Sequence, residues 1–167
     1  GGAGLRARRA YAYGKTMEKD SFYRRRLPHW RMSGASYFVT WRLHAGQPDL
    51  TPDEKTAVFR AIEHFNGDRY ELSAYVVMND HVHVLFSPTG SHHVEDLIHT
   101  WKSFTANFLQ RSTGRVGSVW QDEYFDRIIR DEDEFLEKAK YIVDNPWKRW
   151  PDIAAYAWVA FKGSSEA

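Results

Sequence analysis

The 167-residue chain contains no cysteine, so disulfide bonds and thiolate metal sites are excluded, as is common in a reducing compartment. It also contains no apolar run of transmembrane length and no hydrophobic region of the kind that signal peptides carry near the N-terminus. From these absences we expect a cytoplasmic protein without a membrane partner. The residues that are present, 43% hydrophobic and 16% aromatic, are typical of one packed domain and not of a disordered chain.

The chain has little net charge, +1 at neutral pH, but its charges are unevenly distributed. Residues 1–31 carry nine Lys and Arg against two acidic residues, a net charge of +7. The rest of the chain carries 14 basic and 20 acidic residues, a net charge of −6. A basic arm beside a mildly acidic body indicates a polyanionic partner that one region of the protein contacts. The alternative is a solvated tail without a binding role.

The pattern of apolar residues predicts a strand, a helix, two strands, a helix, a strand and a final helix. The first helix is expected to begin at Thr51-Pro52, a capping residue followed by proline. The last one is expected to end near Asn145, because Pro146 disfavours helical backbone in the residue before it. The expected strands are 37–43, 70–79, 81–86 and the later part of 119–130, and the expected helices are 51–66, 94–110 and 131–145.

This order of elements matches the split βαβ arrangement. We therefore predict an α+β fold, a ferredoxin-like antiparallel sheet in the order β-α-β-β-α-β with an added C-terminal helix that bears a tyrosine. The strand 81–86 would be central in the sheet. The two crossover helices would cover one face, and the other face would be open.

Two histidines lie two residues apart inside the strand 81–86. Side chains alternate between the two faces of a strand, so His81 and His83 point one way while Val82 and Val84 point the other. The valines suit packing against the helices, and the imidazoles would be close enough to share a cation on the open face. We consider His81 and His83 candidate metal ligands, with a half-exposed polar strand face as the alternative.

The last helix carries a tyrosine outside its apolar stripe. At about 100° per residue, the apolar residues between Phe135 and Val143 form one stripe, and Tyr141 and Asn145 fall nearly opposite it. Lys138 falls on the same side as Asn145. Tyr141 could be a surface residue, or it could pack on a tryptophan of the C-terminal segment. Together with the histidine pair, these polar side chains favour a reaction site.

The chemistry that suits these groups is transesterification at a phosphodiester. A cation held by His81, His83 and Asn145 would polarise the scissile phosphate, and Tyr141 would attack phosphorus to form a covalent phosphotyrosine. A phenol with an ordinary pKa of about 10 needs activation, which the cation or Lys138 would supply. Two imidazoles, one amide oxygen and open positions suit Mg²⁺ or Mn²⁺, with Zn²⁺ as an alternative.

Three blocks of the sequence resemble the HUH superfamily of single-tyrosine, IS200-like transposases, and more closely its REP-associated tyrosine transposases. The blocks are Met78-Asn79-Asp80-His81-Val82-His83-Val84-Leu85, Trp120-Gln121-Asp122-Glu123-Tyr124-Phe125-Asp126-Arg127 and Tyr141-Ile142-Val143-Asp144-Asn145-Pro146. The resemblance implies a ferredoxin-like fold, a divalent cation at His81 and His83, and Tyr141 as the nucleophile. Where relatives often carry a glutamine one turn after the tyrosine, this chain has Asn145, which would bind the metal directly or through water.

The resemblance also implies the substrate and the organisation of the chain. The substrate would be single-stranded hairpin DNA, here repetitive extragenic palindromes of bacterial genomes, cleaved to a 5′-phosphotyrosine and a free 3′-OH. We divide the chain into a basic arm (1–31), a catalytic domain (32–150) and a C-terminal extension (151–167) that docks on the domain. The extension would hold the tyrosine helix in cis, so we expect a monomer associated with the nucleoid, with a homodimer as the alternative. The expected DNA-binding residues are Arg24, Arg25, Arg26, Trp30, Arg31, Lys102, Arg127 and Arg130.

Two other functions are compatible with the same residues. A metal-dependent phosphoesterase would combine the two histidines with an acid such as Asp122 or Glu123, and it would tolerate Tyr141→Phe. A non-catalytic module for single-stranded or hairpin nucleic acid would use the sheet and the basic arm without cutting, and it would tolerate loss of both histidines.

Overall fold

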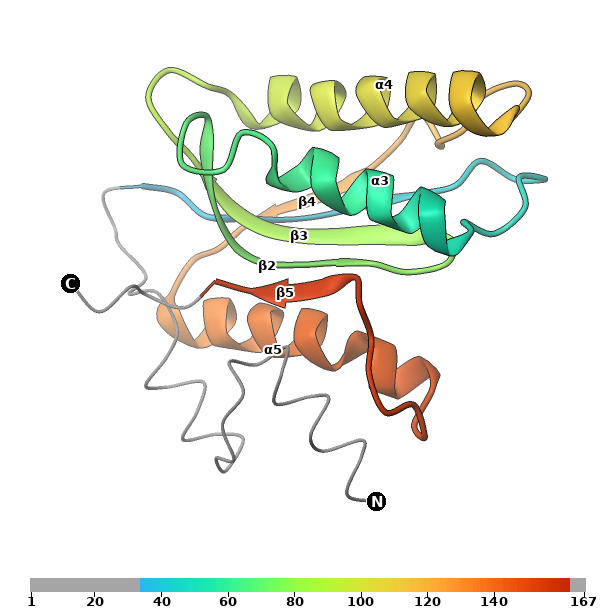
Figure 1. Cartoon of the computed structure of the whole chain (residues 1–167). Helices are drawn as coiled ribbons and strands as arrows, with labels where there is room; N and C mark the ends of the chain where they lie inside the picture. Colours follow the sequence, from blue (N-terminus) through green and yellow to red (C-terminus); the bar gives the residue numbers. More distant parts are fainter. Residues whose placement is uncertain (1–33, 163–167) are drawn as a thin grey trace.

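The computed structural model describes residues 34–162, so the predicted DNA contacts Arg24, Arg25, Arg26, Trp30 and Arg31 lie outside the described residues. Five strands form one sheet in the order β4-β1-β3-β2-β5, and every neighbouring pair is antiparallel (Figure 1). The strands are β1 (Tyr37–Arg42), β2 (Tyr70–Val77), β3 (His81–Pro88), β4 (Phe125–Ile128) and β5 (Val159–Phe161), and the helices are α3 (Pro52–Glu63), α4 (Val94–Thr113) and α5 (Glu132–Arg149). The predicted ferredoxin-like arrangement with a central β3 is confirmed. No helix of the described chain is long and apolar enough to cross a membrane.

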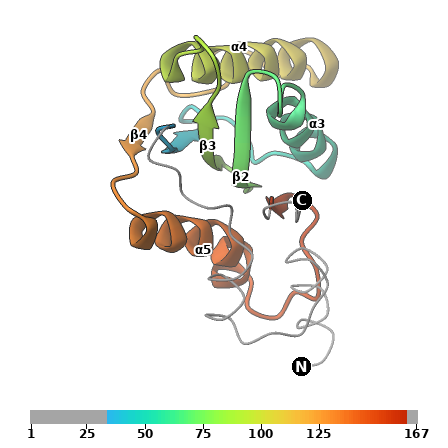
Figure 2. The same cartoon turned by 90° about the vertical axis from the view of Figure 1, so that its left-hand side faces the viewer.

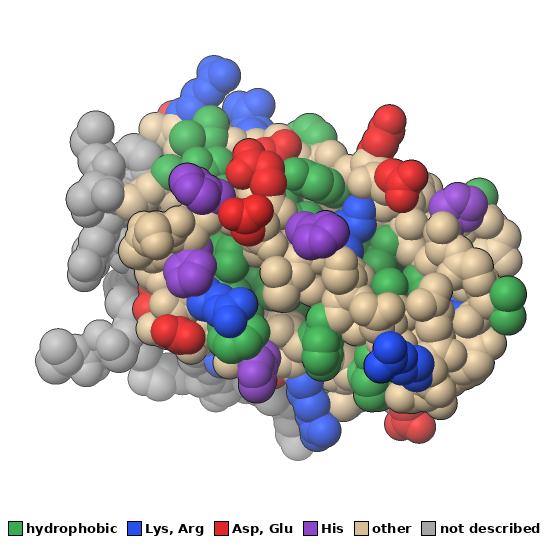
Figure 3. All heavy atoms as spheres, turned by 90° about the horizontal axis from the view of Figure 1, so that it is seen from above, with side chains coloured by type: hydrophobic (Ala, Val, Ile, Leu, Met, Phe, Trp, Pro, Cys, Tyr) green, Lys and Arg blue, Asp and Glu red, His purple; other side chains and the backbone are tan. Residues whose placement is uncertain are grey.

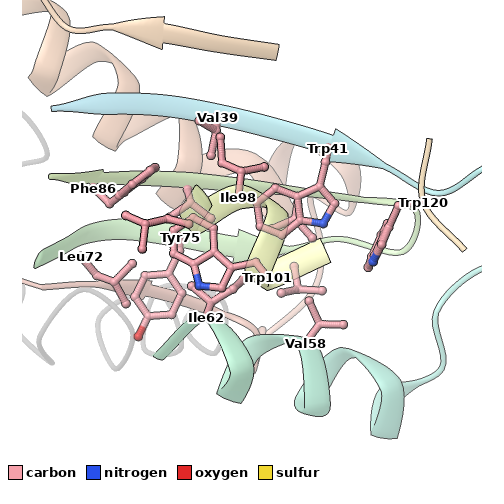
Figure 4. Packing of buried hydrophobic residues seen from close by; sticks show 14 of the residues in the cluster. Val39, Trp41, Val58, Ile62, Leu72, Tyr75, Phe86, Ile98, Trp101 and Trp120 are labelled. Carbon is pink, nitrogen blue, oxygen red and sulfur yellow. The ribbon is translucent and has the colours of Figure 1, made fainter. Parts of the chain in front are cut away.

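The helices α3 and α4 cover one face of the sheet and enclose the larger of two hydrophobic cores (Figures 1 and 4). α3 begins where the sequence predicts, because the Thr51 hydroxyl accepts from the Glu54 N–H and the Glu54 carboxylate accepts from the Thr51 N–H. Val82 and Val84 are fully buried in this core. Each such side chain contributes roughly 1.5–3 kcal/mol, so the valines fix which face of β3 turns towards α3 and α4, and the histidines take the other face.

That other face is covered by α5, the helix that bears the tyrosine (Figure 2). The expectation of an open face beside the histidines is therefore wrong. The apolar stripe of α5 is buried as predicted, and Phe135, Ala139 and Ile142 form a second core with Phe38 and Leu85 of the sheet. A helix with such a stripe must bury it, and the second sheet face offers the apolar surface that it needs.

α5 continues through Pro146 and ends at Arg149, so the predicted end near Asn145 is also wrong. A proline inside a helix removes one backbone donor, and the helix can tolerate this where the residues beyond the proline are well packed. Pro146 and Trp147 are both buried, and the Trp147 indole N–H donates to the Ile153 carbonyl at 3.1 Å. The burial of this last turn outweighs the lost hydrogen bond.

The segment after α5 returns to the sheet. It forms β5, which pairs with β2 and which the sequence analysis did not predict, because three residues are too few for a recognisable alternation. The Tyr156 hydroxyl donates to the Val77 carbonyl at 2.6 Å. The Lys55 Nζ atom of α3 lies 4.5 Å from the centre of the Trp158 ring. The segment is therefore attached both to the sheet and to α3.

Candidate active site

His81 and His83 lie side by side on the face of β3 opposite Val82 and Val84, as the strand alternation predicts. Their ring centroids are 4.8 Å apart. His83 is 3% exposed, whereas the His81 side chain is 16% exposed and lies nearer the surface. The imidazoles therefore form one compact unit with a buried end and an accessible end.

Each imidazole is held through its Nδ1 atom. His83 Nδ1 lies 2.6 Å from Thr40 Oγ1, and His81 Nδ1 lies 2.7 Å from the Asp80 carboxylate. A carboxylate only accepts, so the neutral His81 ring carries its proton on Nδ1 and keeps a lone pair on Nε2. Nε2 of His83 is buried and has no hydrogen-bond partner among the described residues. Outer contacts of this kind orient metal-binding histidines. With the His83 proton on Nδ1, donated to Thr40 Oγ1, the pair fits a metal bound through the two Nε2 atoms.

The surroundings keep His83 neutral. Burial lowers the pKa of His83 to about 3, and the positive charges of a protonated His81, of Arg42 and of Lys138 act in the same direction. A neutral ring has a lone pair available, as a metal ligand requires. A buried polar atom without a partner costs roughly 1–3 kcal/mol, so the orphaned Nε2 is consistent with a ligand-binding role.

Tyr141 projects from α5 towards the histidines. Its ring centroid lies 5.2 Å from that of His83 and 6.0 Å from that of Phe38, both with edge-to-face geometry, and the side chain is 41% exposed. The helical projection placed Tyr141 nearly opposite the apolar stripe, yet its ring contacts the sheet. The reason is that α5 lies along a broad sheet face, so residues on the flank of the helix also reach it. The fold thus brings the tyrosine and the histidine pair together.

Two lysines of α5 flank the tyrosine. Lys138 Nζ lies 5.1 Å from the centre of the Phe38 ring, and Lys148 Nζ lies 5.6 Å from the centre of the Tyr141 ring. Both distances allow cation–π attraction. The sequence analysis named Lys138 but not Lys148, although Lys148 follows Tyr141 by two helical turns, a spacing that could have revealed it. The two lysines give this part of α5 a positive charge, which suits an anionic group.

Asn145, the predicted third ligand, is buried on α5 at 8% exposure, and no hydrogen bond joins it to His81 or His83 in the described part of the chain. The same part of the chain contains no group of three or more His, Cys, Asp and Glu side chains that could hold a metal. Neither Asp122 nor Glu123 therefore completes a site with the histidines. A cation there would take its further ligands from water, substrate or an amide.

The remaining predicted DNA contacts differ in their surroundings. Lys102 on α4 donates to the backbone carbonyls of residues 121 and 122, at 2.7 and 3.0 Å. Arg127 of β4 donates to both carboxylate oxygens of Glu134, at 2.7 and 3.0 Å. Arg130 is exposed between β4 and α5. Figure 3, which views the α4 side, shows Lys and Arg scattered among acidic and histidine side chains and not gathered in one patch. Lys102 and Arg127 thus have structural contacts that a phosphate would have to share.

The sequence analysis missed the contribution of β1 to the site. Thr40 lies opposite His83 in the pairing of β1 with β3, and Arg42 lies opposite His81. The Phe38 ring stacks on His83 at a centroid distance of 5.5 Å. Alternation places these three residues of β1 on one face, but their role follows only once the register with β3 is known.

Comparison with known proteins places this fold and site in a class. Residues 35–145 match the family described as Transposase IS200 like. Because the match spans most of the chain, the protein belongs to the IS200-like transposase family, and the resemblance inferred from the three sequence blocks is confirmed. In sequence the chain is similar to the REP-associated tyrosine transposase of Escherichia coli (strain K12), with 25% identity over 119 residues that make up 70% of this chain and 69% of the relative.

The fold is similar to that of a solved REP-associated tyrosine transposase bound to a REP hairpin. The TM-score is 0.59 at 21% sequence identity, over 74% of this chain and 73% of the other. At this level of identity the likeness supports the fold.

Proposed function

We propose that this protein is a metal-dependent nuclease and strand transferase for single-stranded DNA, with Tyr141 as its nucleophile and REP-type hairpin DNA as its substrate. The observation that carries the proposal is the contact between the Tyr141 ring and His83, whose buried Nε2 atom has no partner. The family supports DNA transposition chemistry. The similar transposase bound to a REP hairpin supports the choice of substrate.

In the proposed reaction the Tyr141 phenol oxygen attacks the scissile phosphorus. The new bond joins that oxygen to phosphorus while the bond from phosphorus to the 3′ oxygen breaks. The phenolic proton passes to solvent, and the 3′ oxygen takes up a proton and leaves as a 3′-OH. The 5′ phosphate stays on Tyr141 as a phosphotyrosine, and attack by a 3′-OH reverses the step and joins two strands.

The side chains around Tyr141 have distinct roles in this proposal. His81 and His83 would hold Mg²⁺ or Mn²⁺ through their Nε2 atoms, and such a cation supplies Lewis-acid stabilisation of the phosphate charge. Asn145 is the proposed third ligand, directly or through water. Lys138 and Lys148 would attract the phosphate by their positive charge.

We also infer that the protein acts as a monomer. The α5 helix that carries Tyr141 packs on the sheet of its own chain, in one core with Phe38 and Leu85. The tyrosine and the histidine pair thus come from the same chain, and no second copy is needed to bring them together. Light scattering of the purified protein, with and without hairpin DNA, tests the inferred state: a molar mass of two chains would contradict it.

The proposed function is tested by looking for a covalent protein–DNA adduct. End-labelled REP-type hairpins with single-stranded flanks are incubated with the protein and Mn²⁺ or Mg²⁺ and analysed on a denaturing gel. We expect an adduct with the wild type that Tyr141→Phe and chelation both abolish. Tyr124→Phe is the matched control, because Tyr124 packs against the core on the α3 and α4 face of the sheet, opposite the face of the histidines.

The other outcomes of this assay identify the competing functions. Cleavage that survives Tyr141→Phe would indicate a metal-dependent phosphoesterase. Tight binding without any adduct, unaffected by replacing His81 and His83, would indicate a binding module.

A further inference from the structure

Phe125 is an exposed aromatic residue on β4, at the edge of the sheet. All four residues of β4 are exposed, and Phe125 is 55% exposed. The register with β1 pairs Phe125 with Thr40 and Arg127 with Phe38. The side chains of Phe125 and Arg127 therefore lie on the same face of the sheet as the histidines. Ile128 has the opposite parity on β4 and is 50% exposed.

A continuous set of ring contacts joins Phe125 to the candidate active site. The Phe125 and Phe38 rings meet edge to face, with a centroid distance of 6.3 Å and an interplanar angle of 68°. Phe38 in turn contacts both His83 and Tyr141. Phe125 is therefore one aromatic ring away from the groups proposed to hold and attack the phosphate.

β4 is held in place on this side of the molecule. The Arg127 side chain, two residues after Phe125, donates to both oxygens of Glu134 in the first turn of α5. This ion pair connects the edge strand to the helix that carries Tyr141. A single exposed aromatic residue is common on protein surfaces. Phe125 is distinguished by its place on an anchored strand, one aromatic ring away from the tyrosine.

We propose that Phe125 is a stacking platform for a base of single-stranded DNA next to the scissile phosphate. This inference rests on the proposed function and extends it to a residue that binds the substrate. If a phosphate is held at Tyr141, the adjacent base would lie within reach of Phe125, the exposed aromatic residue of β4. Aromatic stacking accepts every base, because each has a π-face. The platform would therefore orient the strand without selecting its sequence.

The test compares Phe125→Ala and Phe125→Trp with the control Ile128→Ala, which removes a similarly exposed side chain from the opposite face of the same strand. Each variant is titrated with a fluorescent hairpin that carries a single-stranded flank, and the dissociation constant is measured by anisotropy at fixed salt. We expect Phe125→Ala to weaken binding roughly 10- to 100-fold, while Phe125→Trp and Ile128→Ala bind like the wild type. Thermal melting of all variants checks that each is folded.

A second substrate separates stacking from a general loss of affinity. In a series of hairpins, one base at a time near the cleavage position is replaced by an abasic site. At one position we expect the abasic site to weaken wild-type binding as much as Phe125→Ala does, and to weaken the Phe125→Ala variant no further. Equal binding by wild type and Phe125→Ala, or abasic effects that multiply with the substitution at every position, would overturn the proposal.

Because this readout is binding, it decides the stacking role independently of the chemistry. Failure of the wild type to form an adduct would count against the proposed function. The role of Phe125 in binding would still be decided by the abasic series.

Discussion

Replacing Thr40 by valine should affect both the stability of the protein and its affinity for the proposed metal ion. Thr40 Oγ1 lies 2.6 Å from Nδ1 of His83 in a buried setting, and the other ring nitrogen of His83 has no partner. Valine has the shape of threonine without the hydroxyl, so the variant leaves both nitrogens of a buried imidazole unsatisfied. Loss of one partner of a buried hydrogen bond costs roughly 1–3 kcal/mol, and we expect the free energy of unfolding to fall by about that amount.

The effect on metal binding follows from the same contact. Without Thr40 the His83 ring can rotate and change tautomer, and loss of such an outer contact typically lowers metal affinity about 10- to 100-fold. Urea unfolding in the presence of chelator measures the stability, and calorimetric titration with Mn²⁺ measures the affinity. Thr40→Ser, which keeps the hydroxyl, is the control and should bind Mn²⁺ nearly as the wild type does. Wild-type Mn²⁺ affinity in Thr40→Val would refute the proposed role of the hydrogen bond.

Three further predictions concern other side chains. The Arg115 guanidinium donates to both oxygens of Glu54 and holds the pKa of that carboxyl at about 2, although burial opposes this shift. The stabilisation that the ionised Glu54 provides is therefore complete above pH 4.5 and is lost as the pH falls towards 2. Glu54→Gln should lower the free energy of unfolding by roughly 3 kcal/mol at pH 7 and make it depend less on pH in the acid range. Urea unfolding between pH 7 and pH 3 measures both effects, and a pH dependence equal to that of the wild type would contradict the prediction. Lys55→Ala removes the cation beside Trp158 and the hydrogen bond to Asn79. Hydrogen exchange of the β5 amides should become about tenfold faster or more, while exchange in α4 stays unchanged. Equal acceleration throughout the protein would contradict the view that Lys55 holds the β5 segment in place. Lys148→Ala should slow adduct formation about tenfold, because it removes a charge next to Tyr141. The control Arg111→Ala on α4 should form the adduct at the wild-type rate, and equal rates for the two variants would exclude a role for Lys148.

The sequence was sufficient to predict those features of the fold that follow from local geometry. The two-residue alternation of β3 placed Val82 and Val84 in the core and the histidines on the opposite face, because this period is a property of every strand. The stripe of α5 from Phe135 to Val143 was likewise buried as expected. Local patterns of this kind report which side of an element is apolar.

The features that depend on distant parts of the chain could not be predicted in this way. The helical projection gave the direction of the apolar stripe but not the width of the sheet face that α5 covers, so it did not show that Tyr141 would contact His83. The role of Thr40 depends on the register between β1 and β3, and the course of α5 beyond Pro146 depends on the packing of its last turn. Register and packing are set by long-range contacts that no single window of sequence contains.

The second face of the sheet shows how packing and chemistry are linked in this fold. Ile142 of α5 is fully buried, while its neighbour Tyr141 is 41% exposed and contacts His83 and Phe38 edge to face. The position of the tyrosine is therefore fixed mainly by the burial of the residues beside it. A core residue of α5 such as Ile142 stabilises the domain and at the same time orients the proposed nucleophile. An equally buried residue of α4, such as Ile98, lies in the core on the other face of the sheet and is not next to the tyrosine.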